Sequence, residues 1–102
     1  MAILYVTEFA AIGRDTAGKQ TLLPTEPPLA EQTAVIGVGS VASSAFNAGT
    51  SLVRIHTDAI CSISFGATPT ATATNRRMAA NSTEYFAVPI GYSYKVAVIS
   101  NT

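Results

Sequence analysis

Apolar and polar residues alternate with a period of two through most of the C-terminal half of this chain. Strict alternation over short runs is typical of strands that bury one face, and no stretch shows the 3.6-residue period of a helix. Residues that favour turns separate the runs, including Asp58, Gly66, Pro69 and Gly91. The pattern therefore predicts antiparallel strands over residues 52–57, 60–65, 85–90 and 94–99.

The N-terminal half predicts fewer strands and longer connections. Residues 2–7, 20–23 and 33–38 are rich in residues that favour strands, whereas Gly13, Asp15 and Gly18 indicate a loop over 10–18. The proline-rich segment 24–31 is expected to be extended, because proline donates no ladder hydrogen bond. It either passes from one sheet to the other at their edge or forms an arm that lies on a neighbouring molecule. The threonine- and alanine-rich segment 67–82 is expected to be an exposed loop.

Six to eight short strands in 102 residues predict one all-β domain, residues 1–102, built as a small antiparallel β-sandwich or jelly roll. The apolar positions of the alternating runs form the expected core. They are Leu4, Val6, Val35, Val53, Ile55, Cys61, Ile63, Phe65, Phe86, Val88, Val96 and Val98.

Low charge changes the expected behaviour of the surface. Charged residues make up 12% of the chain, the formal net charge is zero, and alanine, serine and threonine fill 39 positions. Such a surface opposes association only weakly, so we expect a protein that functions while bound to partners. No basic stripe indicates nucleic acid, and residues 2–6 are too short and lack the basic leader expected of a membrane span or signal peptide. The single Cys61 is expected to be a small buried residue.

Two glycine motifs resemble nucleotide-binding loops but lack the necessary context. Residues 13–21 approach a phosphate-binding loop, yet Gln20 stands where a hydroxyl residue is needed and prolines prevent the following helix. Residues 37–42 match a dinucleotide fingerprint without a helix after it. Gly37 and Gly39 are instead expected to allow a bulge or a close backbone approach.

No set of residues predicts catalysis. His56 and Asp58 lie in one expected turn, but a metal site needs three or four converging ligands and no second histidine exists. No nucleophile has a base at useful spacing. We therefore expect no enzyme activity, catalytic residue, metal, cofactor or small-molecule substrate. Asn81 begins a glycosylation triplet that is expected to remain unmodified.

Several residues are candidates for contact with a partner. Arg76 and Arg77 suit a carboxylate on a neighbouring subunit, the alternative being a solvated loop tip. Tyr92 and Tyr94 are expected on one face, where tyrosine suits an interface, although Tyr94 fits the core equally well. The expected contact residues are Pro27, Pro28, Leu29, Arg76, Arg77, Met78, Tyr92 and Tyr94.

Four phrases of the sequence carry a resemblance to a family. Residues 1–10 (MAILYVTEFA), 27–33 (PPLAEQT), 56–66 (HTDAICSISFG) and 89–100 (PIGYSYKVAVIS) resemble the small decoration, or cement, proteins of tailed bacteriophages. The resemblance covers most of the length and includes no catalytic signature. It implies a small β-sandwich or jelly roll that binds the outside of an assembled capsid and bridges neighbouring major capsid subunits.

The expected partners follow from this resemblance. They are the major capsid protein in the assembled shell and further copies of the chain, as a dimer or trimer, with no nucleic acid and no membrane. The expected location is the outer capsid surface of the virion, after synthesis in the host cytoplasm. Two alternatives stay open: a structural component of a tail or fibre, and a carbohydrate-binding module on the virion surface that uses Tyr92, Tyr94 and His56 as a stacking platform.

Overall fold

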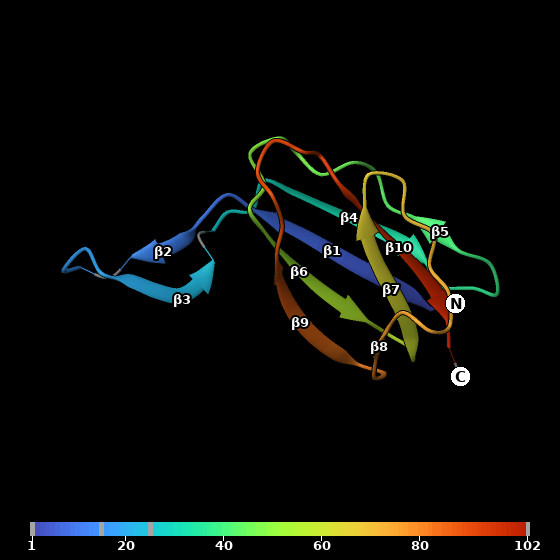
Figure 1. Cartoon of the computed structure of the whole chain (residues 1–102). Coiled ribbons are helices and arrows are strands. Elements are labelled where there is room, and N and C mark those ends of the chain that lie inside the picture. The colour runs from blue at the N-terminus through green and yellow to red at the C-terminus, as the bar shows by residue number, and fades with distance from the viewer. Residues whose placement is uncertain (1, 15, 25, 102) are drawn as a thin grey trace.

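The computed structural model describes residues 2–14, 16–24 and 26–101, and these contain strands and no helix (Figure 1). Two antiparallel four-stranded sheets pack face to face, which confirms the predicted all-β sandwich. The strands of the described residues are β1 (Ile3–Phe9), β2 (Ile12–Arg14), β3 (Gln20–Pro24), β4 (Ala30–Val35), β5 (Val41–Ala42), β6 (Leu52–Thr57), β7 (Cys61–Gly66), β8 (Arg76–Met78), β9 (Ser82–Ala87) and β10 (Lys95–Ser100).

Each sheet brings together strands that are distant in sequence. The first sheet has the order β4-β1-β6-β9, and the second sheet has the order β5-β10-β7-β8. The alternating pattern predicted β6, β7 and β10 closely, and β6 has the predicted bounds. The strand expected over residues 85–90 is β9, which begins three residues earlier. The short edge strands β5 and β8 were not predicted, because two or three residues carry no measurable period.

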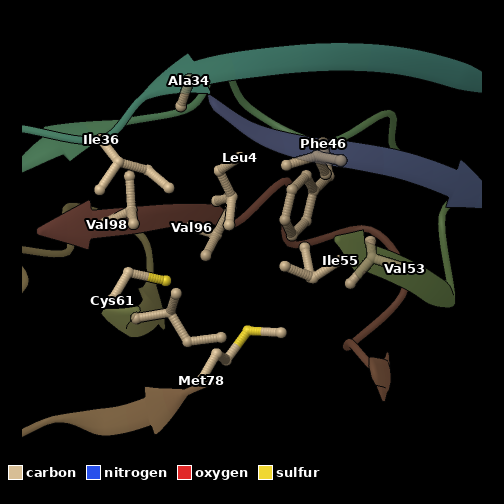
Figure 2. Close-up of a cluster of buried hydrophobic side chains, with 12 residues drawn as sticks. Leu4, Ala34, Ile36, Phe46, Val53, Ile55, Cys61, Met78, Val96 and Val98 are labelled. Carbon is tan, nitrogen blue, oxygen red and sulfur yellow. The ribbon is translucent and has the colours of Figure 1, made fainter. Parts of the chain in front are cut away.

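The core lies between the two sheets and follows the register of the strands (Figure 2). Eight of the predicted core residues are buried there, and Phe65, Phe86 and Val88 pack against them while partly exposed. Val35 was a wrong prediction: it is 44% exposed, because its pairing with Ile3 turns it outward. The buried cluster comprises Leu4, Val6, Ala34, Ile36, Phe46, Val53, Ile55, Cys61, Ile63, Met78, Val96 and Val98.

Most residues of the segment 67–82, which was expected to be an exposed loop, are exposed, but the segment also contains β8 and the first residue of β9. The part of the segment that precedes β8 contacts the outer face of the second sheet through Ala71 and Ala73. Ser62 and Ala97 point to that outer face, yet both are fully buried, and Ala71 is 2% exposed. The Asn101 side-chain amide donates to Ser62 Oγ (2.7 Å) and to the Ala73 carbonyl (3.1 Å). Small alanine side chains let this segment approach the sheet closely.

The glycines at 37 and 39 do not serve a close backbone approach. A Cβ atom at either position would meet no heavy atom within 4 Å, and Val38 between them is 98% exposed. The expected close approach at these glycines was therefore wrong, whereas the alternative of a bulge stays a prediction. They lie in the exposed connection between β4 and β5, at the end of the sandwich that also carries both chain termini (Figure 1).

The strands β2 and β3 pair only with each other and form a hairpin, the arm, that projects from the opposite end of the sandwich (Figure 1). The arm gives the molecule extents of 47 × 26 × 21 Å. Residues 10–18 were predicted to be a loop, but they include β2. The proline-rich segment leads from the arm back into β4, so it does not cross between the sheets.

Candidate interaction surface

Four connections of the chain meet where the arm leaves the sandwich. The loops are residues 10–11, 26–29, 47–51 and 88–92, and we call the surface that they form with Ile12 the arm-bearing end. Backbone and side-chain hydrogen bonds hold them together. Three bonds join loops: Ser51 Oγ donates to Ala10 O (2.6 Å), Val88 N to Ser51 O (3.0 Å) and Gly91 N to Ala48 O (2.9 Å). Leu29 N donates to Glu8 O at the end of β1 (2.7 Å) and so holds the loop 26–29 beside them.

The arm-bearing end is apolar and almost without charge. Ile12 and Leu29 are each about 40% exposed, and Ile90 and Tyr92 are more than 60% exposed. Glu26 is the only charged residue among the described residues of its four loops. Exposed apolar side chains that gather on one part of a surface indicate a site of protein contact.

A buried carboxylate fixes the shape of this end. Glu8 is 2% exposed, because it occupies an inward position of β1. Its Oε1 accepts hydrogen bonds from the Asn47 backbone N–H (2.7 Å) and the Thr50 hydroxyl (2.8 Å), and its Oε2 accepts one from the Gln32 amide (3.3 Å). Charge-assisted hydrogen bonds of this kind are roughly twice as strong as neutral ones. Glu8 therefore ties the loop 47–51 to the first sheet.

A row of aromatic rings crosses the sandwich beneath this end. The ring centroids of Phe46 and Phe65 lie 6.4 Å apart, and those of Phe65 and Phe86 lie 5.2 Å apart, both pairs tilted. The Arg76 guanidinium lies over the outer end of the row, 4.8 Å from the Phe86 ring. Because β8 and β9 belong to different sheets, this cation–π contact closes one open side of the sandwich.

The structure divides the predicted contact residues into three groups. Pro27, Pro28, Leu29 and Tyr92 lie at the arm-bearing end, whereas Arg76 and Arg77 are exposed on β8. Met78 was a wrong prediction, because its pairing with Cys61 turns it into the core, where it is fully buried (Figure 2). The sequence reasoning missed Ile12 and Ile90, which only the meeting of the loops brings together.

The two tyrosines do not form a flat platform with His56. Tyr92 and Tyr94 meet edge to face with centroids 5.5 Å apart, and Tyr94 packs against the core. His56 lies on the outer face of the first sheet, beside Thr83 at the start of β9, whereas Tyr92 follows the end of β9. These three side chains therefore do not share one face.

His56 belongs to a different feature, an open concavity of about 650 Å³ on the outer face of the first sheet. Its ring lies 6.0 Å from that of Tyr5, its Nδ1 is 2.8 Å from Thr83 Oγ1, and its Nε2 is 4.0 Å from Asp58 Oδ1. Arg54 and Glu31 also line the concavity. Within the described ranges, no group of three or more histidine, cysteine, aspartate or glutamate side chains is placed to hold a metal ion.

The buried Cys61 leads to a prediction about stability at high pH. Burial raises the pKa of the Cys61 thiol, and its hydrogen bond to the Thr57 hydroxyl (3.5 Å) acts in the opposite direction. A raised pKa in the folded state means that this stabilisation is complete below the ordinary thiol pKa and is lost as the pH rises past it. We expect the stability advantage of the wild type over Cys61→Ala to shrink by up to about 2 kcal/mol between pH 7 and pH 10.

Urea unfolding of both proteins at each pH measures this difference. Lysine and tyrosine titrations affect both proteins equally, so the comparison isolates the thiol. Unfolding free energies that change in parallel would contradict the prediction.

No family model, curated protein or solved structure matches the chain. Among the residues that the structure describes, no helix has the length and apolar content to cross a membrane.

Proposed function

We propose that this chain is a structural protein of a phage virion, which binds the outside of the assembled head and bridges neighbouring major capsid subunits. The observation that carries the proposal is the pairing of a projecting arm with an apolar, nearly uncharged surface at its base. The resemblance of four sequence phrases to capsid decoration proteins supplies the kind of partner.

The arm supports a binding role because its two strands pair only with each other. A two-stranded hairpin that stands alone is at best marginally stable in water, and strands of three and five residues are short. Packing on a second protein would stabilise it. An arm that binds one subunit and an end that binds the next would together join the two.

The size of the molecule is compatible with two such contacts. A standard interface takes about 800 Å² from each partner, which is roughly one seventh of the 5738 Å² surface of this chain. A shell that holds packed DNA is strained at the contacts between its subunits. A protein clamped across those contacts adds buried area that must be lost before the shell opens.

A binding experiment with assembled shells tests the proposal. We expect the purified chain to sediment with mature heads, and not with unassembled capsid subunits or separated tails. Ile90→Asp places a charge on the arm-bearing end and should weaken binding to heads at least tenfold, because burying an unpaired carboxylate is costly.

Val38→Asp is the matched control, because Val38 is an exposed aliphatic residue at the opposite end of the sandwich. This variant should bind heads as the wild type does. Equal binding to free subunits, or equal loss in both variants, would count against the proposal.

A further inference from the structure

The sandwich has four edge strands, and three of them are short or bridged. β5 has two residues and β8 has three. The edge at β4 is bridged to the second sheet, because the Gln32 side-chain amide accepts from the Ser44 N–H (2.8 Å) and donates to the Ser44 carbonyl (3.2 Å). Short strands and covering contacts are usual means of preventing unwanted strand pairing.

The remaining edge, β9, is long, and only the Arg76 side chain, which lies over Phe86, reaches it from the second sheet. It spans six residues with the sequence STEYFA, which contains no proline and no lysine. Its inner side pairs with β6 in one continuous register, which Val88 N–H extends by donating to Ser51 O. Because backbone groups alternate in direction along a strand, Thr83, Tyr85 and Ala87 direct their N–H and C=O groups away from β6. No described residue bonds to these groups on that side.

We propose that β9 pairs antiparallel with β9 of a second copy of the chain, about a two-fold axis at Tyr85. The pairing would join two four-stranded sheets into one sheet of eight strands. Tyr85 would exchange both of its backbone hydrogen bonds with Tyr85 of the partner subunit, and Thr83 would pair with the partner's Ala87. This interface uses only the chain itself, so it is independent of the proposed binding to heads.

Charge complementarity selects this register. With the axis at Tyr85, Glu84 lies directly opposite the partner's Phe86, over which the partner's Arg76 lies. Two symmetric Glu84–Arg76 ion pairs result, one on each side of the axis. With the axis at Glu84 instead, two carboxylates would face each other, which is unfavourable.

The Tyr85 side chain supports the same register. It lies on the outer face of the first sheet and is 51% exposed. An axis at Tyr85 places the two tyrosine rings opposite each other, and aromatic cross-strand pairs are among the favourable ones. The dimer would thereby cover the largest exposed apolar side chain of β9.

A charge-reversal experiment tests the interface between copies. We expect the wild type to be a dimer in sedimentation equilibrium, and Glu84→Arg and Arg76→Glu each to raise the dimer dissociation constant at least tenfold. When the two variants are mixed, each supplies the charge that the other needs, so a heterodimer should form with nearly wild-type affinity. Misfolding cannot produce that rescue. Arg77→Glu is the matched control, since Arg77 pairs with Ser62 and its side chain lies on the outer face of the second sheet, away from Glu84.

A second variant probes the backbone hydrogen bonds directly. Tyr85→Pro removes an N–H that points away from β6, so it should leave the monomer folded, as judged by circular dichroism, and abolish the dimer. The proposal is overturned if the wild type is a monomer or trimer, if the mixed variants stay monomeric, or if the folded proline variant still dimerises.

Discussion

Removing the arm is expected to reduce binding to phage heads at least a hundredfold while leaving the sandwich folded. The strands of the arm pair so that Ile12 lies opposite Pro24, which places these two residues within one antiparallel pair spacing. Residues 13–23 can therefore be replaced by Asn-Gly, the dipeptide that favours a two-residue turn between antiparallel strands. The replacement removes most of β2 and β3 without opening the base of the arm.

The stability of the sandwich should change little, because β2 and β3 form a separate two-stranded sheet. Thermal unfolding of the shortened chain should occur within a few degrees of the wild type. The loss of a hundredfold in affinity corresponds to about 2.7 kcal/mol, which is modest for an interface that contains the whole arm. Cosedimentation with heads over a range of protein concentrations measures it.

Two results would contradict the role of the arm. One is a shortened chain that binds heads as tightly as the wild type. The other is a shortened chain that unfolds, because the arm would then be part of the folding unit. Combining the shortened chain with Ile90→Asp shows whether the arm and the arm-bearing end act at one contact or at two, since independent contacts give additive losses.

The sequence predicted the central strands well because their signal is local. Apolar residues recur at every second position in Val53 and Ile55 and in Cys61, Ile63 and Phe65, and one buried face follows directly from that alternation. At Val35 the local pattern does not decide which face is buried. Residues 33–38 contain several adjacent apolar residues, so either the odd-numbered or the even-numbered positions could form the buried face. The pairing of Val35 with Ile3 turns Ala34 and Ile36 inward.

Within the segment 67–82, the sequence did not reveal the burial of Ala71 or the strand β8, for a different reason. Its alanine and threonine residues indicated an exposed loop, but the outer face of the second sheet carries Ser62 and Ala97, which leave room for a close second layer. That fit is a tertiary property, and no period within the segment reveals it. The burial of Met78 depends likewise on its pairing with β7.

The arm-bearing end could be predicted only in part. Pro27, Pro28, Leu29 and Tyr92 were expected at a contact surface and lie at this end, but the contact itself stays a prediction. One sequence signal was available and was not used. Glu8 follows Leu4 and Val6 at the same two-residue spacing, so the alternation places its carboxylate inside the sandwich. A carboxylate buried there needs hydrogen-bond donors.

Glu8→Gln is expected to lower the free energy of unfolding by about 2–3 kcal/mol. The substitution keeps the size of the side chain, but it removes the charge that strengthens three hydrogen bonds. An amide also turns one acceptor into a donor, so its NH₂ group must face Gln32 Nε2 or the donors of Asn47 and Thr50. For a domain of this size the loss corresponds to a decrease in Tm of roughly 8–24 °C.

Glu31→Gln is the matched control, because Glu31 lies on the same sheet with its side chain exposed on the outer face. It should change the free energy of unfolding by no more than about 0.5 kcal/mol. Urea unfolding of both variants at neutral pH provides the comparison. If Glu8→Gln proves as stable as Glu31→Gln, the carboxylate does not hold the loop 47–51. The Glu8 variant should also bind heads more weakly than its stability alone explains, because Ala48 and Gly91, which are joined by a backbone hydrogen bond, would move together at the arm-bearing end.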